Sequence, residues 1–221
     1  MCGRNALFLD RRTLEARFDA ELVVDGGYTP RYNVAPGDRL EVVTNEAPGE
    51  IDRFHWGLIP EWADAPTARH FNARAESVAE KPLFERASAS RPCLVLSSGF
   101  YEWDDANRPH RIYREDGAFA MAGLWRVWRG DDGLVACVTV LTTEANETMR
   151  PIHDRMPVVL PPDAESEWLT ADPGVRSDLC RPFSGDLTVD PISTRVNDTA
   201  NDDPNIIEPL GHEQTGLGEF G

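Results

Sequence analysis

The sequence predicts an α+β fold, a single domain with a mainly antiparallel β-sheet or barrel-like core and short helices at its periphery. Short apolar segments typical of strands are mixed irregularly with short helical segments, and no βαβ unit recurs. The 221 residues, 41% of them hydrophobic, suffice for one well-filled core without a break in composition. We expect the domain to span residues 1–210 and a polar, glycine-rich, disordered tail to span 211–221.

The first part of the chain predicts one helix and one strand. Leu14 and Phe18 lie one helical turn apart within residues 10–19, which indicates a short amphipathic helix. A Pro-Gly pair at 36–37 marks a turn, and the apolar residues of 40–43 that follow it predict a strand.

The middle of the chain predicts a loop, then a helical segment, then a strand. Residues 54–63 are rich in Trp, Gly and Pro, which favours a loop over a regular element. Residues 71–87 have helical spacing, and Pro82 limits how far one helix could run. Residues 93–96 predict a buried strand that leads into the segment Gly-Phe-Tyr-Glu-Trp at 99–103.

Two buried strands are predicted over 119–128 and 134–143, joined by a turn at 129–133. The remaining expected elements are a loop that feeds a strand over 149–160, a helix beginning over 165–169 and a last strand over 191–198.

The chain is strongly acidic, with a net charge of −16, and its only lysine is Lys81. An acidic, lysine-poor surface is a halophile's solution to solubility in concentrated salt, so we infer a salt-loving source. The overall charge argues against loose electrostatic binding of nucleic acid. A local cleft of arginines could still hold a strand, because net charge and site charge are separate quantities.

The first residues lack the basic and apolar regions of a secretory signal, and no apolar run is long enough to span a bilayer. We therefore expect a cytoplasmic protein. Cys93, Cys137 and Cys180 show neither close paired spacing nor histidines at zinc-finger distances, which predicts buried thiols without disulfide, metal or cofactor.

Cys2 follows Met1, so removal of the initiator would leave an N-terminal cysteine. Such a residue carries an α-amine with a reference pKa of about 7.7–8.0 beside a thiol with one of about 8.5. The amine can condense with an aldehyde to a Schiff base, and the thiolate can then close a thiazolidine ring. The same pair could instead attack an amide carbonyl, or the cysteine could have no role.

Three further polar residues stand in apolar, Gly- and Pro-rich surroundings. Glu102 is either a solvent-facing strand residue or a buried proton donor whose pKa is raised by desolvation. His153 lies in a proline-bounded loop and suits proton shuttling, although a lone histidine is more often structural. Asn72 could be catalytic or could cap the following helix.

Arginines recur beside these candidates, Arg4 after Cys2, Arg74 after Asn72 and Arg155 after His153. Together they would form a basic lining suited to phosphodiester groups. Trp56 and Trp62 could stack on bases, or could equally be core residues.

Six motifs in order, MCGR, YNVAP, WGLIPEW, NARAE, GFYEW and PIHDRMP, resemble the SOS response-associated peptidase (SRAP) domain family from residue 1 to about residue 210. The resemblance implies a curved antiparallel sheet. It also implies a monomeric enzyme that senses abasic sites in single-stranded DNA and captures the ring-opened sugar as a stable thiazolidine crosslink, with lyase and autopeptidase activities as further expectations.

The resemblance also assigns roles. Cys2 is the nucleophile, Asn72 orients the sugar, Glu102 is the acid/base, and His153 assists ring opening and reversal. The implied DNA-contacting positions are Arg4, Asn33, Trp56, Arg74 and Arg155. Two alternatives remain, a cysteine peptidase or amidohydrolase of the N-terminal-nucleophile type and a non-catalytic module that binds single strands.

Overall fold

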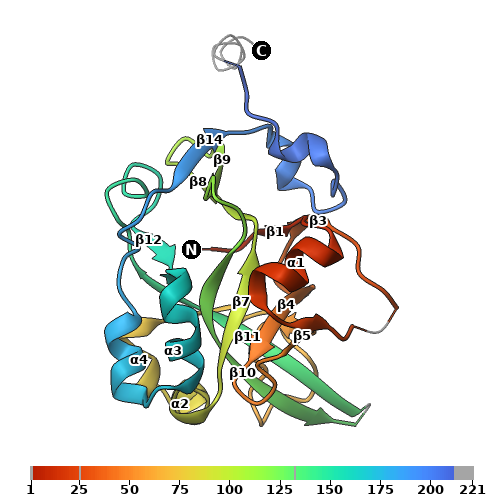
Figure 1. Ribbon diagram of the computed structural model, residues 1–221, viewed down its shortest axis with the longest axis vertical. Helices are drawn as coiled ribbons and strands as arrows, with labels where there is room; N and C mark the ends of the chain where they lie inside the picture. Colours follow the sequence, from red (N-terminus) through yellow and green to blue (C-terminus); the bar gives the residue numbers. More distant parts are fainter. Residues whose placement is uncertain (1, 25, 132, 212–221) are drawn as a thin grey trace.

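Five strands close into a barrel at the centre of the molecule (Figure 1). The structure is a computed structural model that describes residues 2–24, 26–131 and 133–211. The ring runs through β4, β5, β11, β10 and β7, and returns from β7 to β4. These strands are β4 (Arg39–Thr44), β5 (Glu50–Trp56), β7 (Pro92–Ser97), β10 (Phe119–Gly130) and β11 (Gly133–Glu144).

The barrel is antiparallel except at one seam. Strands β5 and β11 pair in parallel, with His55 opposite Cys137 and Trp56 opposite Val138. Every residue of β7 is buried, because one face of the strand packs inside the barrel and the other packs under the helices. The predicted α+β class with a mainly antiparallel, barrel-like core is therefore confirmed.

Further short strands and helices surround the barrel. A second sheet has the order β14-β9-β8-β1-β3 and lies above the barrel in Figure 1. Its strands are β1 (Asn5–Leu7), β3 (Arg31–Val34), β8 (Gly99–Trp103), β9 (Pro109–Tyr113) and β14 (Thr188–Pro191). The barrel sheet is extended by β2 (Glu21–Leu22), β6 (Asn72–Arg74), β12 (Arg155–Pro157) and β13 (Val159–Leu160). The helices are α1 (Arg11–Phe18), α2 (Pro82–Ser90), α3 (Glu165–Thr170) and α4 (Pro173–Leu179), with 3-10 turns η1 (Ala75–Glu80), η2 (Pro162–Ala164), η3 (Thr194–Asn197) and η4 (Pro204–Ile207).

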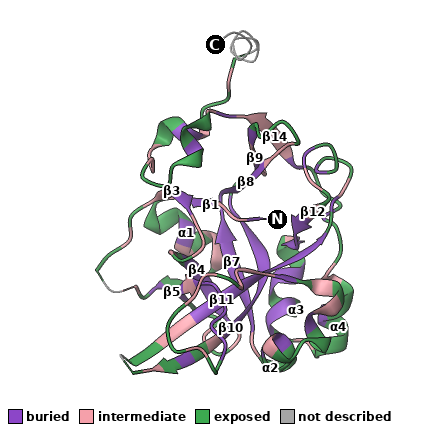
Figure 2. Ribbon diagram, turned by 180° about the vertical axis from the view of Figure 1, so that it is seen from behind, coloured by how far each residue is buried: buried purple, intermediate pink, exposed green. Residues whose placement is uncertain are grey.

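Alternate residues of the barrel strands feed two apolar clusters. One cluster takes in Leu14, Phe84 and Trp168 from the helices. The other takes in the side chain of Cys2 together with strand residues such as Val42. Figure 2 shows β7 and most of β10 and β11 buried, while the far end of the β10–β11 hairpin is exposed. The N-terminal cysteine is therefore packed against the barrel.

Several predicted elements are confirmed. Helix α1 begins after Asp10, whose side chain accepts a hydrogen bond from the Thr13 amide, and ends at Asp19 with a left-handed φ of 47°. The strands expected over 40–43, 93–96, 119–128 and 134–143 and the helix over 165–169 are all present. The turn expected at 129–133 includes residue 132, which lies outside the described residues, as do residues 212–221 of the expected tail.

Three local predictions are wrong. The expected loop over 54–63 begins later, because β5 continues through Trp56 by pairing with β4 and β11. Residues 72–74 form a strand instead of a helix, whereas Pro82 limits the helical segment as predicted: it follows η1 and starts helix α2, since its fixed φ suits the first helical turn. The last strand is β14 and ends at Pro191, and η3 occupies residues 194–197 of the segment where a strand was expected.

The described residues contain neither a membrane-spanning helix nor a metal-binding cluster. None of the helices in the described part of the chain is long and apolar enough to cross a membrane. Among the same residues, no three His, Cys, Asp or Glu side chains are grouped so that they could hold a metal ion.

Candidate active site

Cys2 is fully buried and lies three residues before the first strand, β1. Its carbonyl oxygen accepts a 2.8 Å hydrogen bond from Asn72 Nδ2. Two residues later, the Arg4 carbonyl accepts a 3.1 Å hydrogen bond from the Tyr101 amide, which joins this segment to β8. Burial and then the negative charge of Glu102 raise the pKa of the Cys2 thiol. The thiol is therefore held as S–H until a base removes its proton.

Asn72 reaches Cys2 because β6 is drawn against the barrel. It pairs in parallel with β11, with Asn72 opposite Val140, and the Phe71 carbonyl accepts from the Val140 amide. The alternative that Asn72 caps a helix is wrong, since the residue that precedes η1 is Arg74. The buried Oδ1 atom of Asn72 accepts no hydrogen bond from the described part of the chain, so it can accept one from a ligand.

Glu102 is 3% exposed, which rules out the solvent-facing alternative. Tyr101 packs in a separate cluster on the other face of β8 and Trp103 packs against that cluster, so the alternation of the strand turns the carboxyl group toward the barrel side. Burial raises the pKa of Glu102, and the nearby positive charge of His153 partly opposes this. A carboxyl group in this position can donate a proton at a pH where an ordinary glutamate is ionised.

His153 lies in the loop between β11 and β12, where the Met149 carbonyl accepts from its amide. Its Nδ1 atom is 2.9 Å from the Arg155 amide nitrogen and 2.8 Å from Asp154 Oδ1. The amide favours a lone pair on Nδ1 and the carboxylate favours an N–H there, so Nδ1 has a partner as acceptor and as donor. This arrangement suits a group that takes up and releases a proton.

The structure thus brings together all four predicted catalytic residues. Asn72 is hydrogen-bonded to Cys2, Glu102 interacts electrostatically with the Cys2 thiol, and His153 interacts with Glu102. They come from the chain start, β6, β8 and the loop before β12.

Of the three predicted arginines, Arg74 is exposed, whereas Arg155 and Arg4 are hydrogen-bonded to other parts of the chain. Arg74 is exposed at the end of β6. The Arg155 side chain is only 12% exposed. Its guanidinium donates to both Glu76 carboxylate oxygens at 2.7 and 2.9 Å and to the Thr142 carbonyl at 2.6 Å. A pocket of about 460 Å³ beside it is lined by Arg74, Glu144, Ala145, Arg150, Asp154 and Arg155. Sequence reasoning missed Arg150, although it opens the same loop as His153.

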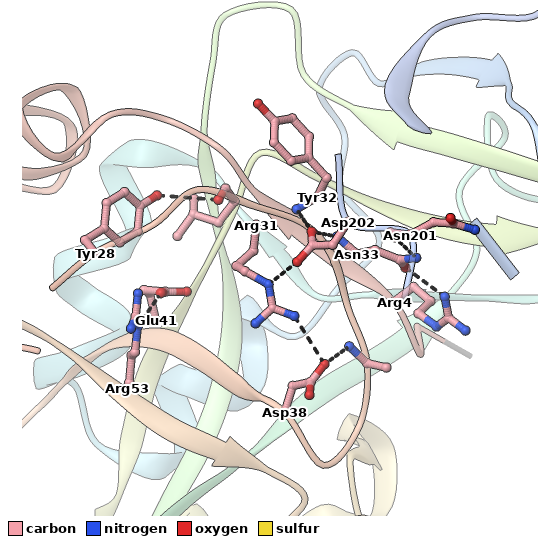
Figure 3. Close-up of polar contacts among 12 residues, drawn as sticks. Arg4, Tyr28, Arg31, Tyr32, Asn33, Asp38, Glu41, Arg53, Asn201 and Asp202 are labelled. Atoms are coloured by element: carbon pink, nitrogen blue, oxygen red, sulfur yellow. Dashed lines mark hydrogen bonds and ion pairs between the residues drawn. The ribbon is translucent and has the colours of Figure 1, made fainter. Parts of the chain in front are cut away.

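Arg4 is the other hydrogen-bonded arginine, and it is bound to Asn33 (Figure 3). Its Nη1 donates to Asn33 Oδ1 at 2.7 Å and to the Val196 carbonyl, and its Nη2 donates to the Asn197 carbonyl at 2.9 Å. Asn33 is completely buried. The hydrogen bonds of both side chains are therefore used within the chain.

The two tryptophans of the WGLIPEW motif differ in accessibility. Trp56 is completely buried and donates from Nε1 to the Phe71 carbonyl at 3.0 Å. Trp62 is 81% exposed. Of this pair, Trp62 is the ring that a base could reach. Cys93 and Cys137 are buried free thiols as predicted, and Cys180 is half-buried.

Comparisons with known proteins agree with one another. A family model described as SOS response associated peptidase (SRAP) matches residues 1–199. The abasic site processing protein YoqW of Bacillus subtilis is 36% identical to this chain, and the alignment covers 94% of the chain and 99% of YoqW. The abasic site processing protein YedK of Escherichia coli is 29% identical, with coverage of 95% and 100%.

A solved structure is also similar. A crystal structure of a protein from Bacteroides thetaiotaomicron superposes with a TM-score of 0.85 at 27% identity. The superposition covers 95% of this chain and all of the other. The two chains therefore share one fold.

Proposed function

This chain belongs to the SOS response associated peptidase (SRAP) family, and we propose that it processes abasic sites in DNA as its relatives' names describe. More specifically, we propose that Cys2, once Met1 is removed, forms a covalent thiazolidine crosslink with the ring-opened sugar of an abasic site in single-stranded DNA. The crosslink would shield the site from strand cleavage.

The observation that carries this proposal is the buried pairing of Cys2 and Asn72 beside Glu102. The raised pKa of the Cys2 thiol disfavours a standing thiolate, which a cysteine peptidase needs as its first nucleophile. The α-amine needs no buried negative charge in the first step, because it attacks as a neutral group. The site therefore favours aldehyde capture over amide hydrolysis.

The steps balance with the groups present. The amine attacks C1′ of the open-chain aldehyde, and one amine proton passes to the aldehyde oxygen. Glu102 then donates a proton to the resulting hydroxyl, which leaves as water to give the protonated imine. His153 then takes the thiol proton, and the sulfur adds to the imine carbon to close the ring. The carbon–nitrogen π electrons move to the protonated nitrogen, which becomes the neutral ring amine, and the proton taken up by His153 returns to the Glu102 carboxylate. Asn72 Oδ1, buried and without a partner among the described residues, can accept a hydrogen bond from a sugar hydroxyl.

We propose that phosphates bind at the pocket formed by Arg74, Arg150 and their neighbours, because local cations can hold a backbone despite a net charge of −16. Trp62 would stack on a base. Asn33 and Trp56, both buried, would support the site from within, and Arg4 and Arg155 would do so through their bonds to the chain. A single strand is favoured because a continuous duplex would not expose the sugar to a buried cysteine.

The test is crosslinking of Met1-processed protein to a single-stranded abasic oligonucleotide, with an intact oligonucleotide as control. We expect an adduct that survives denaturation without any reductant. Because the inferred source is salt-loving, the assay is run at low salt and at about 1 M salt. Absence of an adduct at both would overturn the crosslinking proposal.

Two variants assign the chemistry. Cys2→Ala keeps an N-terminal amine but lacks sulfur, so it should give an adduct only when borohydride reduces the imine. Lys81 is the only lysine in the chain, so its side chain is the one other primary amine that could form an imine. Lys81→Arg should change neither the reductant-free crosslink of the unmodified chain nor the borohydride-dependent adduct of Cys2→Ala. Reductant-free crosslinking by Cys2→Ala would reassign the nucleophile. Cys2-dependent hydrolysis of peptides without any DNA adduct would favour the peptidase alternative.

A further inference from the structure

The segment after β14 is fastened to β3 by the carboxylate of Asp202 (Figure 3). One carboxylate oxygen accepts from the backbone amides of Tyr32 and Asn33, the latter at 2.9 Å. The other oxygen pairs with the Nε atom of Arg31. Asp202 therefore fixes the backbone of β3 at the residue whose side chain reaches Arg4.

The side-chain amide of Asn33 has only one workable orientation. Its Nδ2 lies 2.8 Å from the carbonyl of Asn201 and 3.1 Å from those of Val196 and Asp198. A flipped amide would place Oδ1 against three carbonyl oxygens, which are acceptors only. The Oδ1 atom must therefore face Arg4, from which it accepts at 2.7 Å.

Arg4 is consequently held at both ends. Its guanidinium is bound by Asn33 and by backbone carbonyls of η3, and its own carbonyl is bound by the Tyr101 amide. Only Gly3 separates this fixed residue from Cys2, whose carbonyl is held from the other side by Asn72. The position of Cys2 is therefore set by two chains of contacts, and one of them begins at Asp202.

We infer that Asp202 is a positioning residue for the N-terminal nucleophile, acting through Asn33 and Arg4. This inference rests on the proposed function, since it assigns a role in the same reaction. Asp202 lies beyond residue 199, where the match to the family model ends, so the match itself gives no role to this carboxylate. Positioning is the expected effect, because a misplacement of about 1 Å in a reacting group can lower a rate by about 100-fold.

The test uses Asp202→Ala and Asp202→Asn in the full chain. The asparagine variant keeps an oxygen acceptor for the two amides but loses the charge that pairs with Arg31, so its effect should be smaller. The matched control is Asp203→Ala. This substitution removes the same charge from the same segment, but the Asp203 side chain pairs with Arg195 and accepts from the Asn205 amide, and it makes none of the bonds to β3 that Asp202 makes.

The readout is the crosslinking rate constant at saturating abasic oligonucleotide, measured separately from the oligonucleotide concentration at half-saturation. We expect Asp202→Ala to lower the saturating rate constant by about tenfold or more, with little change in half-saturation. Asp203→Ala should stay within about twofold of the unmodified chain. An unchanged saturating rate constant in Asp202→Ala would overturn the inference.

A double-mutant cycle tests the route. If Asp202 acts through Asn33, then Asn33→Ala/Asp202→Ala should be no slower than Asn33→Ala alone. Rate losses that multiply would show that Asp202 acts by another route, and would contradict the inference. If Asp202→Ala does not fold, the same double-mutant cycle is measured with Asp202→Asn in its place.

Amide hydrogen exchange keeps this inference separate from the proposed function. In Asp202→Ala, exchange should accelerate in residues 2–5 and 31–34, and in Asp203→Ala it should not. If the unmodified chain forms no crosslink but this pattern appears, the proposed function fails and the positioning stands. If the chain crosslinks but exchange in residues 2–5 is unchanged, the positioning fails alone.

Discussion

The side-chain amide of Asn72 donates a 2.8 Å hydrogen bond to the backbone carbonyl of Cys2, across 70 residues of sequence. This bond fixes the carbonyl side of the residue whose amine and thiol we propose as nucleophiles. It leaves the Asn72 Oδ1 atom for a ligand. The function of Asn72 can therefore be separated from its contribution to folding.

Asn72→Ala should lower the saturating crosslinking rate by about tenfold or more, because Cys2 loses a fixing contact and the sugar loses an acceptor. The free energy of unfolding should fall by only about 0.5–1.5 kcal/mol, the usual contribution of one hydrogen bond. Single-turnover crosslinking and urea unfolding check the two numbers. As a control, Asn45→Ala removes an amide that donates to the Ser90 carbonyl, and should leave the crosslinking rate unchanged.

Glu102→Gln should change the pH profile of crosslinking. Burial raises the pKa of Glu102, so its acid form persists to a higher pH than that of an ordinary glutamate and is lost as the pH rises through the raised pKa. The rate in the unmodified chain should fall along this alkaline limb. In the glutamine variant the rate should be low throughout and the limb should be absent. A limb that survives in Glu102→Gln would belong to another group.

Glu102 should also make stability depend on pH. Between its ordinary pKa and its raised pKa, the folded chain binds the proton more tightly than the unfolded chain, so the free energy of unfolding falls as the pH rises through this window. Glu102→Gln should therefore gain stability relative to the unmodified chain across the window. Urea unfolding at several pH values measures this difference, and a constant difference would contradict the buried placement.

Arg74→Ala should weaken DNA binding, whereas Arg155→Ala should lower stability. Arg74 is exposed, so its loss should weaken binding of single-stranded DNA and reduce the salt slope of log K by about 0.7, the value for one phosphate contact on a single strand. Arg155 is bound to Glu76 and Thr142, so its loss should lower the melting temperature. Fluorescence anisotropy over a salt series and thermal melting distinguish the two. Equal effects on melting would contradict this division.

Trp62→Ala should weaken binding of single-stranded DNA by about 1–3 kcal/mol and leave the melting temperature unchanged, because the ring is exposed and can stack on a base. Trp56→Phe should lower stability by about 1 kcal/mol, because the bond from Nε1 to the Phe71 carbonyl is lost. The same binding and melting assays apply. A larger loss of DNA affinity in Trp56→Phe than in Trp62→Ala would show that the buried ring becomes accessible.

Local sequence patterns predicted four of the five barrel strands. The strands of 93–96, 119–128 and 134–143 were predictable because a buried strand needs a continuous apolar run, which any window of the sequence reveals. The extension of β5 through Trp56 was not predictable in this way. Its last residues are strand only because β4 and β11 supply hydrogen bonds from distant parts of the chain.

The candidate catalytic residues could be found from sequence because each is a polar residue in an apolar or Gly- and Pro-rich motif, and the motifs resemble one family. The sequence by itself determined the α+β class and the family, and it predicted Cys2, Asn72, Glu102 and His153 as candidate site residues. It could not tell the exposed Arg74 from the hydrogen-bonded Arg155, since each lies two residues after a candidate site residue.

Only the tertiary structure decided which side chains can meet a ligand. It buried Asn33 and Trp56, paired Arg155 with Glu76, and connected Asp202 to Cys2 through Arg4. The physical reason is that burial and hydrogen-bond partners are supplied by residues far apart in the chain. An apolar run or a motif is local, whereas the environment of a polar side chain exists only after the barrel has closed and the segment after β14 has docked on β3.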